Sequence, residues 1–157
     1  MKLGLLSLLA LALLIATISA GAQEAAEPAC PVTHPSGDDG DYSNDALQVS
    51  LPLNGTFVFE PEGPGFVAVS DGALGIKVLW NRLVAGDLRI EGRRLDASAP
   101  PLRAHFTPYL EIGIQPSYVI FPTPGCWEVT GRVGDASLTF VVLVEKVGDG
   151  PTWRLDL

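Results

Sequence analysis

Apolar and polar residues alternate in two runs, 127–133 and 136–145, and this pattern predicts a β-hairpin. An alternation with period 2 is typical of a strand that buries one face. Gly134 and Asp135 between the runs suit a two-residue type II′ turn, because glycine adopts the positive φ that the first turn position requires. The turn sets the register, in which the opposed pairs are Val129 with Phe140 and Trp127 with Val142.

A second hairpin is predicted nearer the N-terminus. The alternating run 47–51 is separated from the run 57–59 by a stretch with the turn residues Asn54 and Gly55. A three-residue loop over 53–55 matches the apolar faces better than a two-residue turn does. The pairs expected from this loop are Leu51 with Phe57 and Val49 with Phe59.

A third hairpin is predicted around Asp71 and Gly72. The runs 67–69 and 74–80 both alternate, and a two-residue turn between them would let both strands bury the same face. The pairs expected from this turn are Val69 with Leu74 and Val67 with Ile76.

Three shorter strands are predicted at 88–90, 102–106 and 118–121, with an irregular stretch at 107–116. Turn residues recur about every 8–12 residues, and no helical period is present. About eight or nine strands therefore predict an all-β domain over 46–157. The expected architecture is an antiparallel β-sandwich of the immunoglobulin-like kind, and a small closed barrel is the alternative.

The first residues predict export. Residues 1–22 contain Lys2, an apolar run and the small residues Ala20 and Ala22, which is the pattern of a cleaved signal peptide. A retained membrane anchor is the alternative. Residues 23–45 carry three prolines and an acidic run, and we expect an irregular leader there. The domain is accordingly expected to be secreted or held at the cell envelope, without contact to the membrane after cleavage.

The two cysteines, Cys30 and Cys126, predict one disulfide, since paired cysteines are common in exported chains. In the alternating run, Cys126 shares its face with Glu128 and Thr130 and not with Trp127. The bond is therefore expected at the edge of the sandwich, outside the main core.

Charge and composition exclude several activities. The chain has 18 acidic and 10 basic residues, a net charge of −8, which opposes binding to nucleic acid. Its histidines, His34 and His105, lack the motifs of a hydrolase. The one methionine, Met1, lies in the predicted signal peptide, so the mature chain has no methionine for a soft copper site. The acidic run 38–45 does not match the spacing of a calcium loop. No catalytic residue, metal or cofactor is predicted.

One local group of basic residues could contact a ligand. It lies near a pair of prolines and consists of Arg93, Arg94 and Arg103, with Tyr109 in the next loop. Arginine with an aromatic ring can bind a carboxylate or a sugar. The competing interpretation, which the sequence favours, is that these arginines form ion pairs with neighbours such as Glu91 and Asp96.

The chain also resembles a family of uncharacterised exported bacterial proteins. The residues that carry the resemblance are Cys30-Pro31-Val32-Thr33, Asn44-Asp45-Ala46-Leu47, IEGRRLDASAPPLRA from Ile90 to Ala104 and, most specifically, FPTPGCWEVTGRVGDASLTFVV from Phe121. The resemblance implies an immunoglobulin-like sandwich. It also supports pairing the two cysteines, because each lies inside a matching motif. It implies no activity.

These observations predict a non-catalytic binding or structural module whose partner is a protein or carbohydrate at the cell envelope. The alternative is an exported hydrolase or metal carrier with a site built from loops. A deep pocket with converging carboxylates or histidines would favour that alternative.

Overall fold

The computed structural model describes residues 29–63, 65–107 and 110–156. These residues form eleven strands and no helix, and none of their elements is a helix that could cross a membrane. The predicted signal peptide, 1–22, lies outside the described residues. The strands are β1 (Asp41–Ser43), β2 (Leu47–Ser50), β3 (Thr56–Phe59), β4 (Phe66–Val69), β5 (Leu74–Arg82), β6 (Leu88–Arg94), β7 (Arg103–His105), β8 (Gly113–Phe121), β9 (Gly125–Val133), β10 (Ala136–Lys146) and β11 (Arg154–Leu155).

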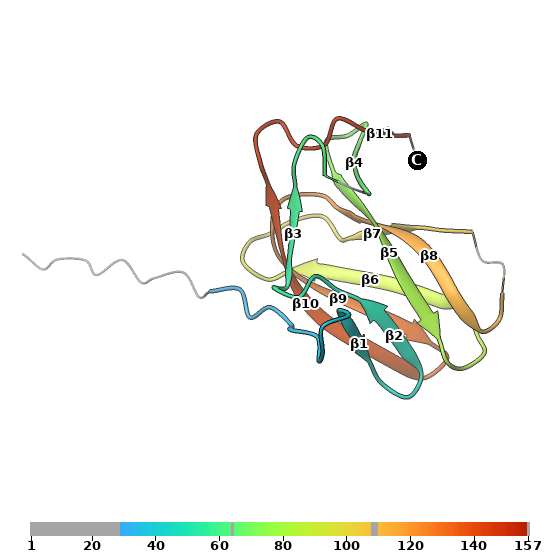
Figure 1. The fold of residues 1–157 in the computed structure, drawn as a ribbon. Coiled ribbons are helices and arrows are strands. Elements are labelled where there is room, and N and C mark those ends of the chain that lie inside the picture. Colours follow the sequence, from blue (N-terminus) through green and yellow to red (C-terminus); the bar gives the residue numbers. More distant parts are fainter. Residues whose placement is uncertain (1–28, 64, 108–109, 157) are drawn as a thin grey trace, which may run out of the picture.

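The strands form two sheets that pack as a β-sandwich (Figure 1). In the seven-stranded sheet, called sheet A here, β8 pairs with the full length of β5 and with β7. The other edge of β5 pairs with β2 at one end and with β4 at the other, and these lead to β1 and β11. Sheet B has the order β3-β10-β9-β6. The all-β prediction is confirmed, but the pairs β3–β10 and β4–β11 are parallel, so the sandwich is not purely antiparallel.

The central hairpin forms as predicted. Val129 lies opposite Phe140 and Trp127 opposite Val142 in the β9–β10 ladder. Gly134 has a φ of 55°, and a type II′ turn requires a positive φ at this first position. Asp135 at the second position does not have a positive φ, because all described residues with a positive φ are glycines. All four paired side chains are buried in the main core.

The predicted hairpin over 47–59 is wrong, because its two strands belong to different sheets. Val49 lies opposite Trp80 in sheet A, and Phe59 is in β3, which runs parallel to β10 in sheet B. Alternation identifies the buried face of a strand but not its neighbour. Each sheet buries the face that points into the shared core. Val49 and Phe57 therefore both lie at apolar positions of an alternating run, although they are not paired.

The β4–β5 hairpin forms, but its register differs by one residue from the prediction. Phe66 lies opposite Ile76, where Val67 was expected. The loop contains three residues, 70–72, in place of two. Gly72 has a φ of 88°, as the third position of such a loop needs.

This difference turns Val67 and Val69 to the outer face of sheet A, because a one-residue slip exchanges the two faces of a strand. Val69, expected opposite Leu74, donates its N–H to the carbonyl of Ala73 at 2.8 Å. On the outer face, Val69 and Ala73 pack with Ile120 in a small second cluster. Sheet A is therefore partly apolar on both faces.

Strand β8 begins at Gly113, within the stretch predicted to be irregular. Pro116 lies inside this strand, opposite Leu79 of β5. At Pro116 no strand of the described chain pairs with the other side of β8, since β7 pairs only with residues 118–120. Proline is tolerated on such an edge because its missing N–H breaks no ladder.

Trp80 joins the two sheets in the main core. Its ring is fully buried and lies 5.9 Å from the ring of Phe140, measured between centroids. A Cβ on Gly131 would come within 2.3 Å of the Trp80 ring, so only glycine fits beneath the indole. Leu88 and Val133 close the core nearby.

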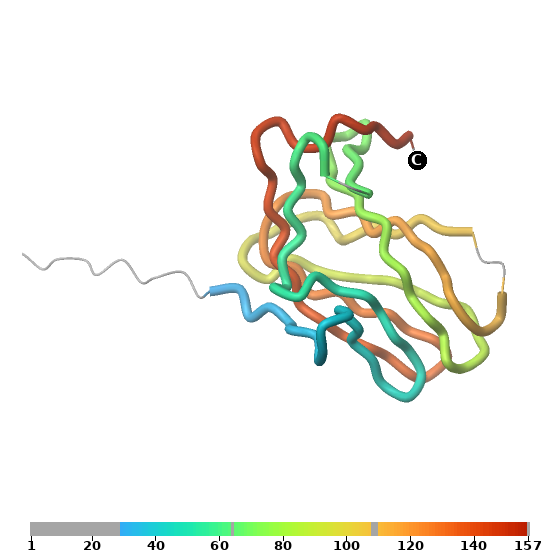
Figure 2. The backbone as a smooth tube through the Cα atoms, viewed as in Figure 1, coloured from blue at the N-terminus to red at the C-terminus, as the bar shows by residue number. Residues whose placement is uncertain are grey.

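The leader is attached to the outer side of sheet B. The disulfide between Cys30 and Cys126 is present, with the two Cα atoms 5.5 Å apart. Cys126 lies opposite Leu143, on the face away from the main core, as predicted. Thr33 then donates its N–H to the Val141 carbonyl at 2.8 Å and accepts the Val141 N–H on its hydroxyl. Figure 2 shows the leader passing beside the start of β3.

Part of this leader is regular. Residues 41–43 form β1, which pairs with β2, although an irregular segment was expected over 23–45. Asn44 donates its side-chain N–H to the Ser137 carbonyl at 2.8 Å. Asn44 and Thr33 therefore cover the edge of β10 that β3 leaves unpaired, which protects this edge from pairing with another chain.

Candidate functional site

The three predicted arginines do not form one patch. Arg93 and Arg94 are neighbours in β6 of sheet B and so project to opposite sides, while Arg103 lies in β7 of sheet A. The fourth candidate residue, Tyr109, lies outside the described residues. A ligand contact by these residues stays a prediction.

Each of the three arginines forms an ion pair. Arg93 contacts Glu128 at 2.8 Å, Arg94 contacts Asp96 at 2.6 Å, and Arg103 contacts Asp71 at 2.8 Å. The pair of Arg94 with Asp96 is one that the sequence suggested. Glu91, the other suggested partner, instead contacts Arg132.

The outer face of β6 and β9 carries a shallow depression of about 420 Å³. The pairs Arg93–Glu128 and Arg132–Glu91 cross it, each at 2.8 Å. Thr130 also lines it and shares a hydrogen bond with Thr139 of β10. Its charged groups are thus already neutralised in pairs, which leaves little unpaired charge for a ligand.

A second surface is apolar and lies where β5 ends and β8 begins. We call it the β5–β8 end patch. Its members are large apolar side chains, each between 39% and 54% exposed: Leu79, Leu83, Val84, Leu110, Ile112 and Ile114. Contiguous exposed apolar surface in a folded protein marks an interaction site, whereas single exposed residues do not.

The register of the β5–β8 ladder places four members of the patch on one face. Asn81 lies opposite Ile114, and Leu79 lies opposite Pro116, on the outer face of sheet A. Leu83 directly follows the last paired residue of β5, and Ile112 directly precedes the first paired residue of β8. Both residues therefore extend the same face. In Figure 1 this end of the sandwich lies on the side opposite to the leader.

Arg82 positions the loops that carry the patch. Its side chain is only 2% exposed, and it donates to the carbonyl oxygens of Gly86 and Leu110. Gln115, which is also buried, donates its side-chain N–H to the Thr107 carbonyl at 3.2 Å. The two loops are therefore attached to the end of the sheet by buried polar side chains.

Sequence reasoning missed this patch. The available signal was Leu79. Its neighbours Val78 and Trp80 lie on the apolar face of the alternating run, so a polar residue is expected at position 79. Ile112 and Ile114 lay in the stretch predicted to be irregular, and so their face was not assigned.

The histidines occupy separate places. His34, in the leader, contacts the Leu53 carbonyl at 3.2 Å through its ring Nδ1. His105 lines a depression of about 190 Å³ with Lys77 and Tyr118 on sheet A. Among the residues that the structure describes, no three His, Cys, Asp or Glu side chains lie close enough together to hold a metal ion.

The chain was compared with known proteins. No protein-family model matches it, and no curated protein or solved structure is significantly similar to it.

Proposed function

We propose that this protein is an extracytoplasmic, non-catalytic binding module that docks on a partner protein through the β5–β8 end patch. The observation that carries the proposal is the presence of six exposed apolar side chains at one end of the sandwich, four of which share one face of sheet A: Leu79, Leu83, Ile112 and Ile114. An apolar patch buried by a partner gains free energy because it leaves water. Arg82 keeps the patch ordered before binding, which reduces the entropy that docking costs.

The charge around the patch indicates the kind of partner. Glu111 lies between two patch residues, and Asp87 is exposed in the β5–β6 loop. Two copies of this chain would bring these carboxylates together, and acidic lipids would repel them. The expected partner is a protein with an apolar surface and a basic rim.

The patch favours a protein over a carbohydrate as the partner. All six patch residues are aliphatic, so they offer no flat aromatic ring on which a sugar could stack. An apolar centre surrounded by a polar rim is instead the arrangement found in protein interfaces.

The proposed location outside the cytoplasm has independent support. The Cys30–Cys126 disulfide is typical of chains that fold in an oxidising compartment. The apolar N-terminal segment and its small-residue cleavage site support export. The resemblance to exported bacterial proteins supports the same location and an immunoglobulin-like topology within the sandwich.

Site-specific photocrosslinking tests the proposed surface. A photoreactive amino acid is placed at Leu83 or at Ile114 of the full chain, and the protein is expressed in its native host. We expect the same partner protein in both adducts. The matched control is a photoreactive residue at Thr139, which is exposed on the outer face of sheet B and should not give this adduct.

A charged substitution in the patch is a second test of the proposed surface. Ile112→Asp, made together with the crosslinker at Ile114, should abolish the adduct, because burying an unpaired carboxylate opposes docking. Circular dichroism confirms that the variant is folded. An adduct with a second copy of this chain, an adduct with lipid, or equal crosslinking from Thr139 would each overturn the proposal.

A further inference from the structure

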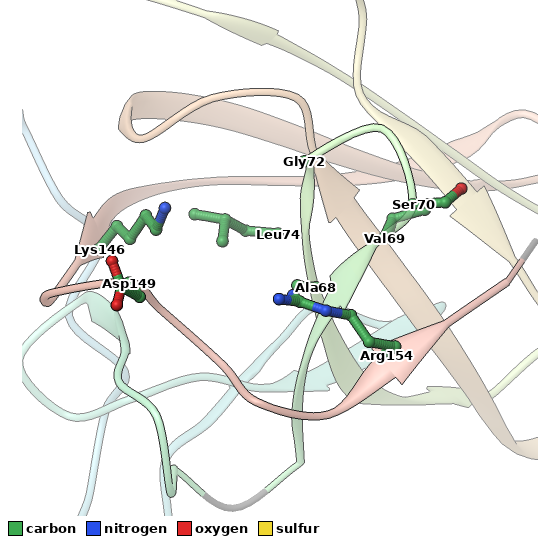
Figure 3. A pocket seen from close by; sticks show the side chains of 8 residues that line it. All are labelled: Ala68, Val69, Ser70, Gly72, Leu74, Lys146, Asp149 and Arg154. Carbon is green, nitrogen blue, oxygen red and sulfur yellow. The ribbon is translucent and has the colours of Figure 1, made fainter.

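The end of the sandwich beside the C-terminal segment contains a different kind of site. A half-open pocket of about 320 Å³ lies between β4 and the segment that follows β10 (Figure 3). Its polar side chains are Ser70, Lys146, Asp149 and Arg154, and its floor is apolar, with Ala68 and Leu74. The pocket is separate from the β5–β8 end patch, since the two share no residue.

The fold directs Arg154 into this pocket. Strand β11 runs parallel to β4, and Arg154 pairs with Ala68, whose side chain is on the inner side of sheet A. The Arg154 Nη1 donates to the Pro151 carbonyl at 3.3 Å, which fixes one end of the guanidinium. The Nε and Nη2 groups form the other edge of the fork, and this edge can bind both oxygens of a carboxylate.

Lys146 approaches from the other side. Its stem lies against Gly150, where a Cβ would come within 2.7 Å of the lysine Cε. Gly150 also has a φ of 74°, and its N–H binds the Val147 carbonyl at 3.0 Å, so the turn holds the lysine stem in place. In Figure 3 the Lys146 ammonium and the Arg154 guanidinium extend into the pocket from opposite sides.

The charges of this pocket differ from those of the β6–β9 depression. There, each arginine is neutralised by a glutamate. Among the described residues, neither Lys146 nor Arg154 forms an ion pair, although Asp149 lines the same pocket. The pocket thus offers two cations for one anion, on a chain with a net charge of −8.

We infer that this pocket binds a small sugar acid. Its carboxylate would lie between Lys146 and Arg154, and its hydroxyl groups would donate to Asp149. Asp149 accounts for the choice of ligand, because a carboxylate beside two cations weakens the binding of a bare anion but accepts hydrogen bonds from hydroxyl groups. The apolar floor suits the C–H face of a sugar ring.

Calorimetric titration of the exported protein at low salt tests this inference. The probes are glucuronate, glucose, acetate and inorganic phosphate. We expect glucuronate to bind at least tenfold more tightly than each of the other three, because only it combines the carboxylate with the hydroxyl groups. Equal affinity for acetate or phosphate, or no binding of glucuronate, would overturn the inference.

Three substitutions locate the binding. Arg154→Gln and Lys146→Gln should each lower the affinity for glucuronate at least tenfold. The matched control, Arg89→Gln, removes the same charge from an exposed arginine of β6 and should have no effect. If Arg89→Gln weakened glucuronate as strongly, the binding would be nonspecific attraction and the inference would be wrong.

Asp149→Asn separates the two roles of the carboxylate. It should lower the affinity for glucuronate, because it removes an acceptor for hydroxyl groups. It should raise the affinity for acetate, because it removes a negative charge. Stronger binding of both probes would contradict the sugar acid.

Amide chemical shifts place the bound probe at 146–154. Ile112→Asp should leave this binding unchanged, so failure of the partner proposal and failure of the sugar-acid site are distinguishable.

Discussion

Arg82 donates a hydrogen bond of 2.8 Å from Nη1 to the carbonyl oxygen of Gly86, four residues later in the chain. Its Nη2 donates to the carbonyl of Leu110, which precedes β8. A buried guanidinium without a carboxylate partner is costly unless its N–H groups are bonded. Here the two Nη groups are bonded, whereas Nε is buried without a partner among the described residues. The two bonds fix the loops that carry Val84 and Ile112 of the end patch.

Arg82→Met should loosen the end patch while the sandwich stays folded. The substitution keeps an unbranched apolar stem but removes both hydrogen bonds, and bonds from charged donors contribute about 1.5–3 kcal/mol each. Removal of a buried charge offsets part of this loss, so we expect a net destabilisation of about 1–3 kcal/mol. Hydrogen exchange should be faster at 83–87 and 110–112 and unchanged in the β9–β10 hairpin.

Arg89→Met is the matched control, since Arg89 is exposed and its side chain is not buried at the end of the sheet. It should leave exchange at 83–87 unchanged. Equal protection of both loops in Arg82→Met and in the unmodified protein would show that Arg82 does not position them.

The sequence predicted most reliably the elements whose signals are local. The β9–β10 register follows from a two-residue turn and the strands beside it, and it is confirmed by the pair Val129–Phe140. The place of the disulfide outside the main core also followed from local parity at Cys126, whereas the pairing itself followed from the presence of two cysteines in a chain predicted to be exported. In both cases the face on which a side chain lies is set by its neighbours in the same strand.

The errors arise where the decisive contact is distant in sequence. Nothing near Val49 indicates that its partner is Trp80 and not Phe59, because all three are apolar and face one interior. The parallel strand β11 is two residues long and depends on β4, far earlier in the chain. The candidate surfaces were missed for the same reason, since Lys146 and Arg154 converge only after β11 has paired.

Gly131→Ala should destabilise the whole domain. The added Cβ would lie 2.3 Å from the buried ring of Trp80, and neither sheet can move away without disturbing the core. Overpacking of this kind costs about 1–3 kcal/mol. Chemical denaturation should show a lower midpoint with an unchanged slope.

A double-mutant cycle isolates the contact. In a Trp80→Leu background, which is itself destabilised by a cavity, Gly131→Ala should cost clearly less than in the unmodified protein. Additive costs would mean that Trp80 does not determine the need for glycine at 131, and the loss would then come from the backbone of β9.

Two surface aspartates should titrate differently when their arginine partners are removed. The side-chain hydrogen bond from Arg94 is the main cause that lowers the pKa of Asp96 below its ordinary value. The pKa of Asp71 is also lowered, chiefly by the N–H of Ala73 and only secondarily by Arg103. Arg94→Gln should therefore raise the pKa of Asp96 more than Arg103→Gln raises that of Asp71. Carboxyl carbon NMR titration measures both.

The sign of the linked stability follows from these shifts. Because each folded-state pKa lies below the unfolded value, the ionised carboxylates stabilise the fold at pH values above the unfolded pKa, which is about 3.9 for aspartate. That contribution is lost as the pH falls through the folded pKa. Solvent screening keeps it small at these exposed positions. An Asp96 pKa that does not rise in Arg94→Gln would refute the assigned cause.

Reduction of the disulfide should release the leader and leave the sandwich folded. Cys30 and Cys126 are 96 residues apart in sequence, and a loop of that length is expected to contribute about 4–5 kcal/mol in the chain-entropy model. The main core does not include the bond, and the Trp127–Val142 pair does not depend on it. Amides of the β9–β10 hairpin should therefore keep their protection after reduction, although the global stability falls.

The leader has a second attachment, through the two hydrogen bonds between Thr33 and Val141. Cys30→Ser should thus increase exchange first at 29–32 and less strongly near Thr33. Cys30→Ser combined with Thr33→Val, which removes the hydroxyl acceptor, should expose the edge of β10 around Val141. This edge would then be free to pair with another chain, so the double variant should aggregate faster than either single variant. Fast exchange throughout the hairpin in Cys30→Ser alone would show instead that the bond supports the core.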